Sequence, residues 1–132
     1  MNVLFICRGN VGRRQAAMSF YNQLGLGHAD SAGTLLKYPD IRLVDNGVAD
    51  NVIEALAEYG IDVSSNVPSQ VKEDQLNDYD QIIVMAEPET IPEWLKNNPK
   101  TVLWDVPDVK GEDLDTTRDI FNEIRARVSS LH

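Results

Sequence analysis

The sequence predicts an α/β protein, a three-layer sandwich around a four-stranded parallel sheet in the flavodoxin-like order 2-1-3-4. Two observations carry this prediction. Short apolar runs alternate with longer stretches of helical periodicity along the chain, and such alternation implies right-handed crossovers between parallel strands. The length of 132 residues suits one domain spanning residues 1–132.

The strands are expected where apolar runs are too short for helices, at residues 3–7, 28–32, 82–85 and 101–106. Helices are expected where apolar residues recur every three or four positions, at residues 11–24, 47–59 and 114–131. Pro92 interrupts the pattern over residues 88–96 and predicts two short pieces there. In the order 2-1-3-4, the end of the first strand lies next to the switch point, where ligands bind in such sheets.

Composition narrows the range of partners. The net charge of −9 and the pI near 4.5 argue against nucleic acid or an anionic membrane as a partner. No apolar run reaches the length of a spanning helix, and the first residues lack the features of a signal peptide, so we expect a cytoplasmic protein. The single cysteine excludes an intramolecular disulfide.

The first strand ends at that cysteine, Cys7, and a glycine-containing loop follows it. Gly9 and Gly12 on either side of Asn10 allow backbone N–H groups to turn inward, and the next helix points its positive end into the same loop. Such a loop fits a tetrahedral oxyanion. Arg13 adds a planar fork of donors that can bind two phosphoryl oxygens.

Arg8, Arg13 and Arg14 form a local basic cluster in an acidic chain. They mark the clearest place for an anion to bind. The inward N–H groups, the positive end of the helix and Arg13 should also favour the thiolate, so Cys7 is predicted to titrate below the ~8.5 of an ordinary thiol. A buried structural cysteine remains the alternative interpretation of the same pattern.

The segment from Val3 to Arg14 resembles the phosphate-binding loop of the low-molecular-weight protein tyrosine phosphatases and of the related thiol-linked arsenate reductases. The resemblance extends over nearly the whole chain. It implies that Cys7 is the nucleophile, that residues 8–14, Val11 included, surround the phosphoryl group, and that neither metal nor cofactor takes part.

The segment of residues 104–111 is similar to the acid loop of that family, which reads Asp-Pro at its centre. Matching Pro107-Asp108 to it makes Asp108 the general acid and base, with Asp105 as a competitor. A loop that only caps the last helix is the alternative. Val109 replaces the usual proline, and no tyrosine follows it.

Two further residues are assigned through the resemblance. Ser31 would hold Asn10, although a polar turn would also explain it. Tyr38, in a segment longer than is typical of the family, would stack on a substrate ring, although a surface tyrosine is equally expected.

Arg14 is the main departure, because the family usually has serine or threonine there to donate a hydrogen bond to the sulfur. Arginine could stabilise the thiolate by charge, or it could turn outward and leave turnover slow. The leading hypothesis is a phosphatase that acts on a phosphorylated protein or small aryl phosphate ester through a phosphocysteine. The alternatives are an arsenate reductase that uses an external small thiol and a phosphate-binding or phosphopeptide-binding module with little turnover.

Overall fold

The computed structural model of the chain describes residues 1–8, 12–36, 41–45, 49–109 and 112–131. Its centre is a parallel sheet in the order β2-β1-β3-β4. The strands are β1 (Asn2–Cys7), β2 (His28–Gly33), β3 (Gln81–Val84) and β4 (Thr101–Leu103). The predicted fold class and strand order are therefore confirmed.

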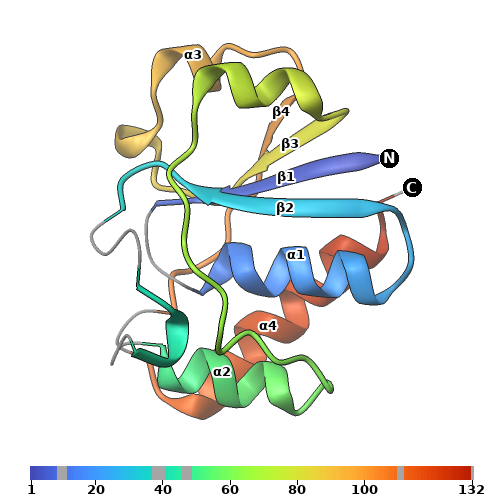
Figure 1. Cartoon of the computed structure of the whole chain (residues 1–132), viewed down its shortest axis with the longest axis vertical. Coiled ribbons are helices and arrows are strands. Elements are labelled where there is room, and N and C mark those ends of the chain that lie inside the picture. Colours follow the sequence, from blue (N-terminus) through green and yellow to red (C-terminus); the bar gives the residue numbers. More distant parts are fainter. Residues whose placement is uncertain (9–11, 37–40, 46–48, 110–111, 132) are drawn as a thin grey trace.

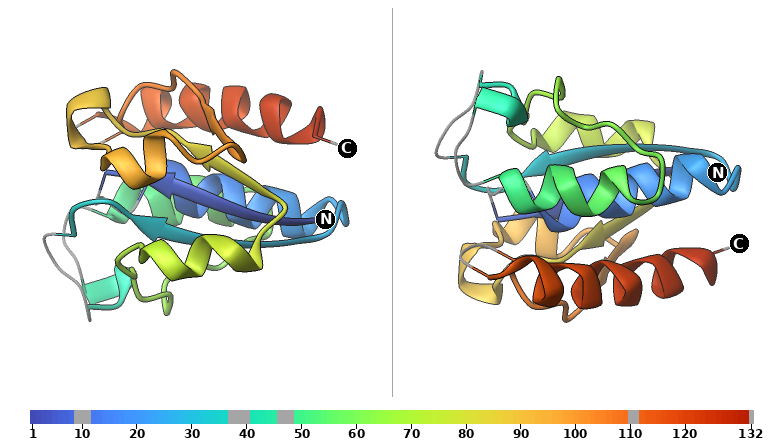
Figure 2. Two further views of the ribbon diagram at one scale, coloured as in Figure 1. Left: turned by 90° about the horizontal axis from the view of Figure 1, so that it is seen from above. Right: turned by 90° about the horizontal axis from the view of Figure 1, so that it is seen from below.

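Helices cover both faces of this sheet (Figures 1 and 2). One face carries α1 (Arg13–Gln23), α2 (Asp50–Ala57) and α4 (Leu114–Ser129). The other carries the 3-10 helix η2 (Glu73–Asp78) and α3 (Glu93–Lys96), with the 3-10 turn η3 (Pro88–Thr90) beside them. A third 3-10 turn, η1 (Leu43–Asp45), precedes α2.

The core is divided between the two faces by the alternation of side chains along β1. Phe5 and Cys7 point toward α1 and α4, whereas Leu4 and Ile6 point toward η2 and α3, and all four are fully buried. A run of apolar residues without polar alternation is what a strand covered on both faces requires.

Several elements are shorter than their patterns predict. The helix expected over residues 47–59 is observed as Asp50–Ala57, and Gly60 ends it with a φ of 77°. The strand expected over residues 101–106 ends at Leu103, because the chain then turns so that Val106 enters the core. The two short pieces predicted around Pro92 are present as η3 and α3.

The register places Cys7 at the carboxyl edge of the sheet. Cys7 lies opposite Gly33, the last residue of β2, and Ile6 lies opposite Val84, the last residue of β3. The segments that leave β1, β2 and β3 therefore start side by side. In the part of the chain that the structure describes, no helix is both long and apolar enough to cross a membrane.

Candidate active site

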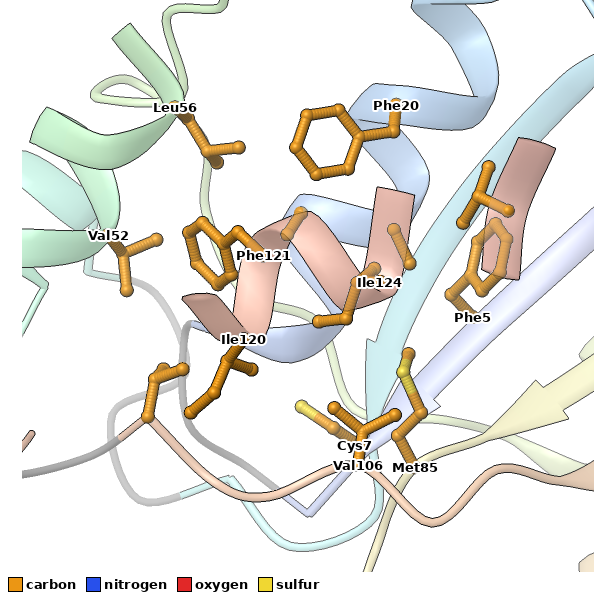
Figure 3. Packing of buried hydrophobic residues seen from close by; sticks show 14 of the residues in the cluster. Phe5, Cys7, Phe20, Val52, Leu56, Met85, Val106, Ile120, Phe121 and Ile124 are labelled. Carbon is orange, nitrogen blue, oxygen red and sulfur yellow. The ribbon is translucent and has the colours of Figure 1, made fainter. Parts of the chain in front are cut away.

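Cys7 lies at the bottom of the candidate site, in the buried core. Its side chain is fully buried and lies with Met85 and Val106 at the end of the core beneath α4 (Figure 3). The Cys7 carbonyl accepts a hydrogen bond of 2.9 Å from the Thr34 N–H, and the Thr34 hydroxyl donates to the Arg8 carbonyl at 3.0 Å. The exit from β1 is thus fixed by the segment that follows β2.

The first turn of α1 concentrates positive charge above Cys7. Gly12 is the N-cap, and the first turn contains Arg13 and Arg14 but no acidic residue. Cations at this end of a helix are unfavourable because the helix dipole is positive there. An oxyanion bound at this end would relieve that repulsion.

Arg14 is turned inward toward the thiol, which decides between the two orientations that the sequence left open. Its side chain has no exposed surface. Burial lowers the pKa of its guanidinium, whereas the charge of Cys7 and a side-chain hydrogen bond with Cys7 raise it. Arg14 therefore interacts with the sulfur, where the family usually has a hydroxyl.

The pKa of the Cys7 thiol is raised, not lowered. Burial is the largest cause, and the charges of Arg14 and Arg13 together with the Arg14 backbone N–H oppose it, while Asp108 adds to the rise. The expectation of a thiol that titrates below its ordinary value is therefore wrong. A fully buried sulfur loses more hydration than the two neighbouring cations restore.

This electrostatic balance can be measured by titrating the thiolate absorbance near 240 nm. We expect Cys7 to ionise above the ordinary thiol value of ~8.5, so the thiolate signal should increase only as the pH rises past that value. Arg14→Gln should move the transition to still higher pH, because it removes the largest stabilisation of the thiolate. Arg8→Gln is the control, since Arg8 is exposed and is not among the causes of the shift. A transition near pH 6, or one that Arg14→Gln leaves in place, would contradict this account.

Arg13 connects the Cys7 loop to the segments that follow β3 and β4. Its side chain is 3% exposed, and its Nη1 donates to the Val106 carbonyl at 3.0 Å. Its Nη2 lies 3.2 Å from Glu87 Oε1 and 3.9 Å from Asp108 Oδ2. Its buried Nε–H donates to no acceptor within the described residues. The contacts of Nη1 and Nη2 therefore hold the Arg13 guanidinium in place.

Asp108 is held on a loop that is anchored in the core. Val106 and Val109, on either side of Pro107-Asp108, are both buried in the cluster beneath α4. The Asp108 side chain is 34% exposed and is close enough to Cys7 to affect its pKa. Asp105 is exposed, and it is not among the groups that shift the pKa of Cys7. This geometry supports Asp108 over Asp105 as the acid, although that role stays a prediction.

A pocket of about 470 Å³ opens next to Arg13 and Asp108. It lies between the segments that follow β3 and β4 and has apolar walls and several carboxylates. Its lining comprises Arg13, Met85, Ala86, Glu87, Pro88, Leu103, Trp104, Asp105, Val106, Pro107 and Asp108. A leaving group attached to a phosphoryl group at Cys7 could occupy this space.

The other predicted site residues are distributed differently. Arg8 is exposed. Ser31 lines a separate polar pocket with Gln15 and Asn66, and its carbonyl accepts a hydrogen bond from Ser69. Its predicted contact with Asn10 lies outside the described residues, as do Gly9, Val11 and Tyr38. No group of three or more potential metal ligands occurs among the residues that are described.

Glu87 is a site residue that the sequence analysis missed. It follows β3 by three residues and forms the closest ion pair with Arg13. The available signal was its position, because the carboxyl end of the third strand adjoins the Cys7 loop in the predicted strand order.

The chain is similar in sequence and in fold to known proteins. A family model described as low molecular weight phosphotyrosine protein phosphatase matches residues 2–132. A glutaredoxin arsenate reductase from Synechocystis sp. is 26% identical over 131 residues, which cover 98% of this chain and 94% of that protein.

Solved structures give the same division between two activities. The low molecular weight protein tyrosine phosphatase from T. tengcongensis is 26% identical with a TM-score of 0.79, covering 98% of this chain and 95% of that one. An arsenate reductase from Archaeoglobus fulgidus DSM 4304 is 27% identical with a TM-score of 0.74, covering 96% and 94%. This chain belongs to the low molecular weight phosphotyrosine protein phosphatase family.

Proposed function

We propose that the chain hydrolyses phosphotyrosine or small aryl phosphate monoesters through a phosphocysteine intermediate. The observation that carries this proposal is the convergence on Cys7 of two buried arginines and one carboxylate, Asp108. Cations beside the sulfur suit a phosphoryl group, and the carboxylate provides the proton transfer that a phosphate ester requires.

Because the pKa of Cys7 is raised, its thiol first gives its proton to a phosphoryl oxygen of the substrate dianion. The thiolate then attacks phosphorus, the P–S bond forms as the bond to the leaving oxygen breaks, and Asp108 gives that oxygen its proton. Arg13 binds the phosphoryl oxygens. In the second step Asp108, now a carboxylate, takes a proton from water as the water attacks phosphorus. The P–S bond then breaks, and Arg14 stabilises the departing thiolate through its charge.

Arsenate reduction is the second candidate, and the similarity to two arsenate reductases at 26% and 27% identity favours it. Cys7 would form an S–As bond with arsenate as one arsenate oxygen leaves as water. An external thiol would then attack the Cys7 sulfur, the S–As bond would break, and its electron pair would pass to arsenic and reduce As(V) to As(III). Cys7 would leave as a mixed disulfide, and a second molecule of thiol would regenerate it. The two electrons come from two external thiols, because the chain has one cysteine.

One paired assay separates the candidates. The protein is given p-nitrophenyl phosphate and a phosphotyrosine peptide without added thiol, and separately arsenate with glutathione and glutaredoxin. We expect thiol-independent phosphate release that is lost in Cys7→Ser. Arsenite formation without phosphate release would instead establish the second candidate. If neither phosphate nor arsenite is released but inorganic phosphate binds saturably, the protein is a phosphate-binding module.

A further inference from the structure

The pocket beside Arg13 and Asp108 has an unbalanced charge. Arg13 is the one cation among its described lining residues, which include three carboxylates: Glu87, Asp105 and Asp108. Arg13 is already matched by Glu87 at 3.2 Å and by Asp108 at 3.9 Å. The described lining therefore carries more negative than positive charge, and Asp105, which is exposed, is the lining carboxylate for which no ion pair with Arg13 is present.

A cation that lies close to the Trp104 ring, on α4, does not correct this imbalance. Arg127 of α4 lies with its guanidinium 5.8 Å from the centre of the Trp104 ring, and it is not part of the pocket lining. It donates to the Asp105 backbone carbonyl at 3.4 Å and forms an ion pair with Glu123 at 3.3 Å. Its charge is thus matched outside the pocket.

The remaining walls are apolar. Trp104 and Leu103 contribute hydrophobic surface, and Leu103 is 51% exposed, whereas Met85 is almost fully buried. The pocket also contains Arg13, whose almost fully buried Nε–H has no acceptor in the described chain. One end of the pocket is therefore suited to a phosphoryl oxygen, and the other combines apolar surface with negative charge.

We propose that this pocket selects phosphoryl substrates whose leaving group carries a positive charge on an apolar stem, and that Asp105 is the residue that sets this preference. The proposal rests on the proposed function, because it concerns the leaving group of the same reaction. The stem packs against Trp104 and Leu103, and the cation lies near Asp105. The net charge of −9 further favours the approach of cationic molecules.

The test measures binding separately from turnover. The affinities of three benzylphosphonates are compared by calorimetry at low salt: unsubstituted, with a para aminomethyl group, and with a para carboxylate. We expect the cationic compound to bind about twofold to fivefold more tightly than the neutral one and the anionic compound to bind more weakly, a range typical of exposed charge pairs. Added salt should reduce the differences.

Matched variants identify the residue responsible. Asp105→Asn should remove most of the cation preference, whereas Asp74→Asn, which changes the net charge equally at an exposed position that does not line this pocket, should keep it. Equal affinities for the three compounds would overturn the proposal. Equal losses in the two variants would also overturn it, since the effect would then come from overall charge.

Turnover of phosphotyramine, 4-ethylphenyl phosphate and 3-(4-phosphooxyphenyl)propanoate then links the pocket to the reaction. The same order in kcat/KM is expected, because the three phenols are similar leaving groups. The charge order in binding without any turnover would support the pocket but reject the phosphatase. Turnover without a charge order would reject the pocket alone.

Discussion

Replacing Cys7 with serine should abolish hydrolysis of aryl phosphates, with a fall in kcat of at least about 10³-fold, since the reaction loses its nucleophile. Serine is close in size, but its hydroxyl is a far weaker nucleophile than a thiolate at this buried position. The measurement is the steady-state rate with p-nitrophenyl phosphate.

Binding provides the control for this variant. Cys7→Ser should still bind inorganic phosphate, because Arg13 and the start of α1 are unchanged, and it should keep the circular dichroism spectrum of the wild type. A folded Cys7→Ser protein with wild-type turnover would show that the thiol is structural.

Replacing Asp108 with asparagine should slow the reaction according to the leaving group. The acid matters most for a poor leaving group, so phenyl phosphate hydrolysis should fall by about 10²-fold to 10⁴-fold. p-Nitrophenyl phosphate should be much less affected, because its leaving group needs little protonation. The measurement is kcat/KM for a series of phenyl phosphates whose ring substituents carry no charge.

Asp105→Asn is the comparison that decides between the two carboxylates. It should keep the wild-type dependence on the leaving group, since Asp105 is exposed and does not influence the Cys7 thiol. If Asp105→Asn steepened that dependence and Asp108→Asn did not, the assignment of the acid would have to be reversed.

The sheet and the Cys7 position could be predicted from the sequence because they depend on local patterns. A short apolar run that ends in Cys7, with Gly9 shortly after it, is sufficient to place Cys7 at a strand end, and the structure has it there. The inward direction of Arg14 could also be predicted from helical spacing. It precedes Ala17 by three residues and Tyr21 by seven, and both lie on the buried face of α1.

The direction of the Cys7 pKa shift and the Arg13–Glu87 ion pair could not be obtained in this way, because the predicted strand order places Glu87 only near the Cys7 loop. The pKa of Cys7 depends on the balance between its dehydration on burial and the charges of Arg13 and Arg14. Sequence spacing indicates the nearby charges but not the degree of burial. The ion pair joins Arg13 to Glu87, which are 74 positions apart in the sequence, so it can be seen only in the packed structure. Local patterns predict where side chains start but not which distant partners they meet.

The loop that carries Asp108 is anchored in the core by the valines on either side of it. Val106 and Val109 are part of the same cluster as Phe121 and Ile124, so the position of Asp108 depends on the packing of α4 against the sheet. Freeing this loop would require removing two valines from the core, which costs about 1.5–3 kcal/mol for each side chain. Local opening of this loop is therefore rare in the native protein but is easier than unfolding of the whole chain. Substitutions in the core beneath α4 should make it more frequent and so displace Asp108 without touching it.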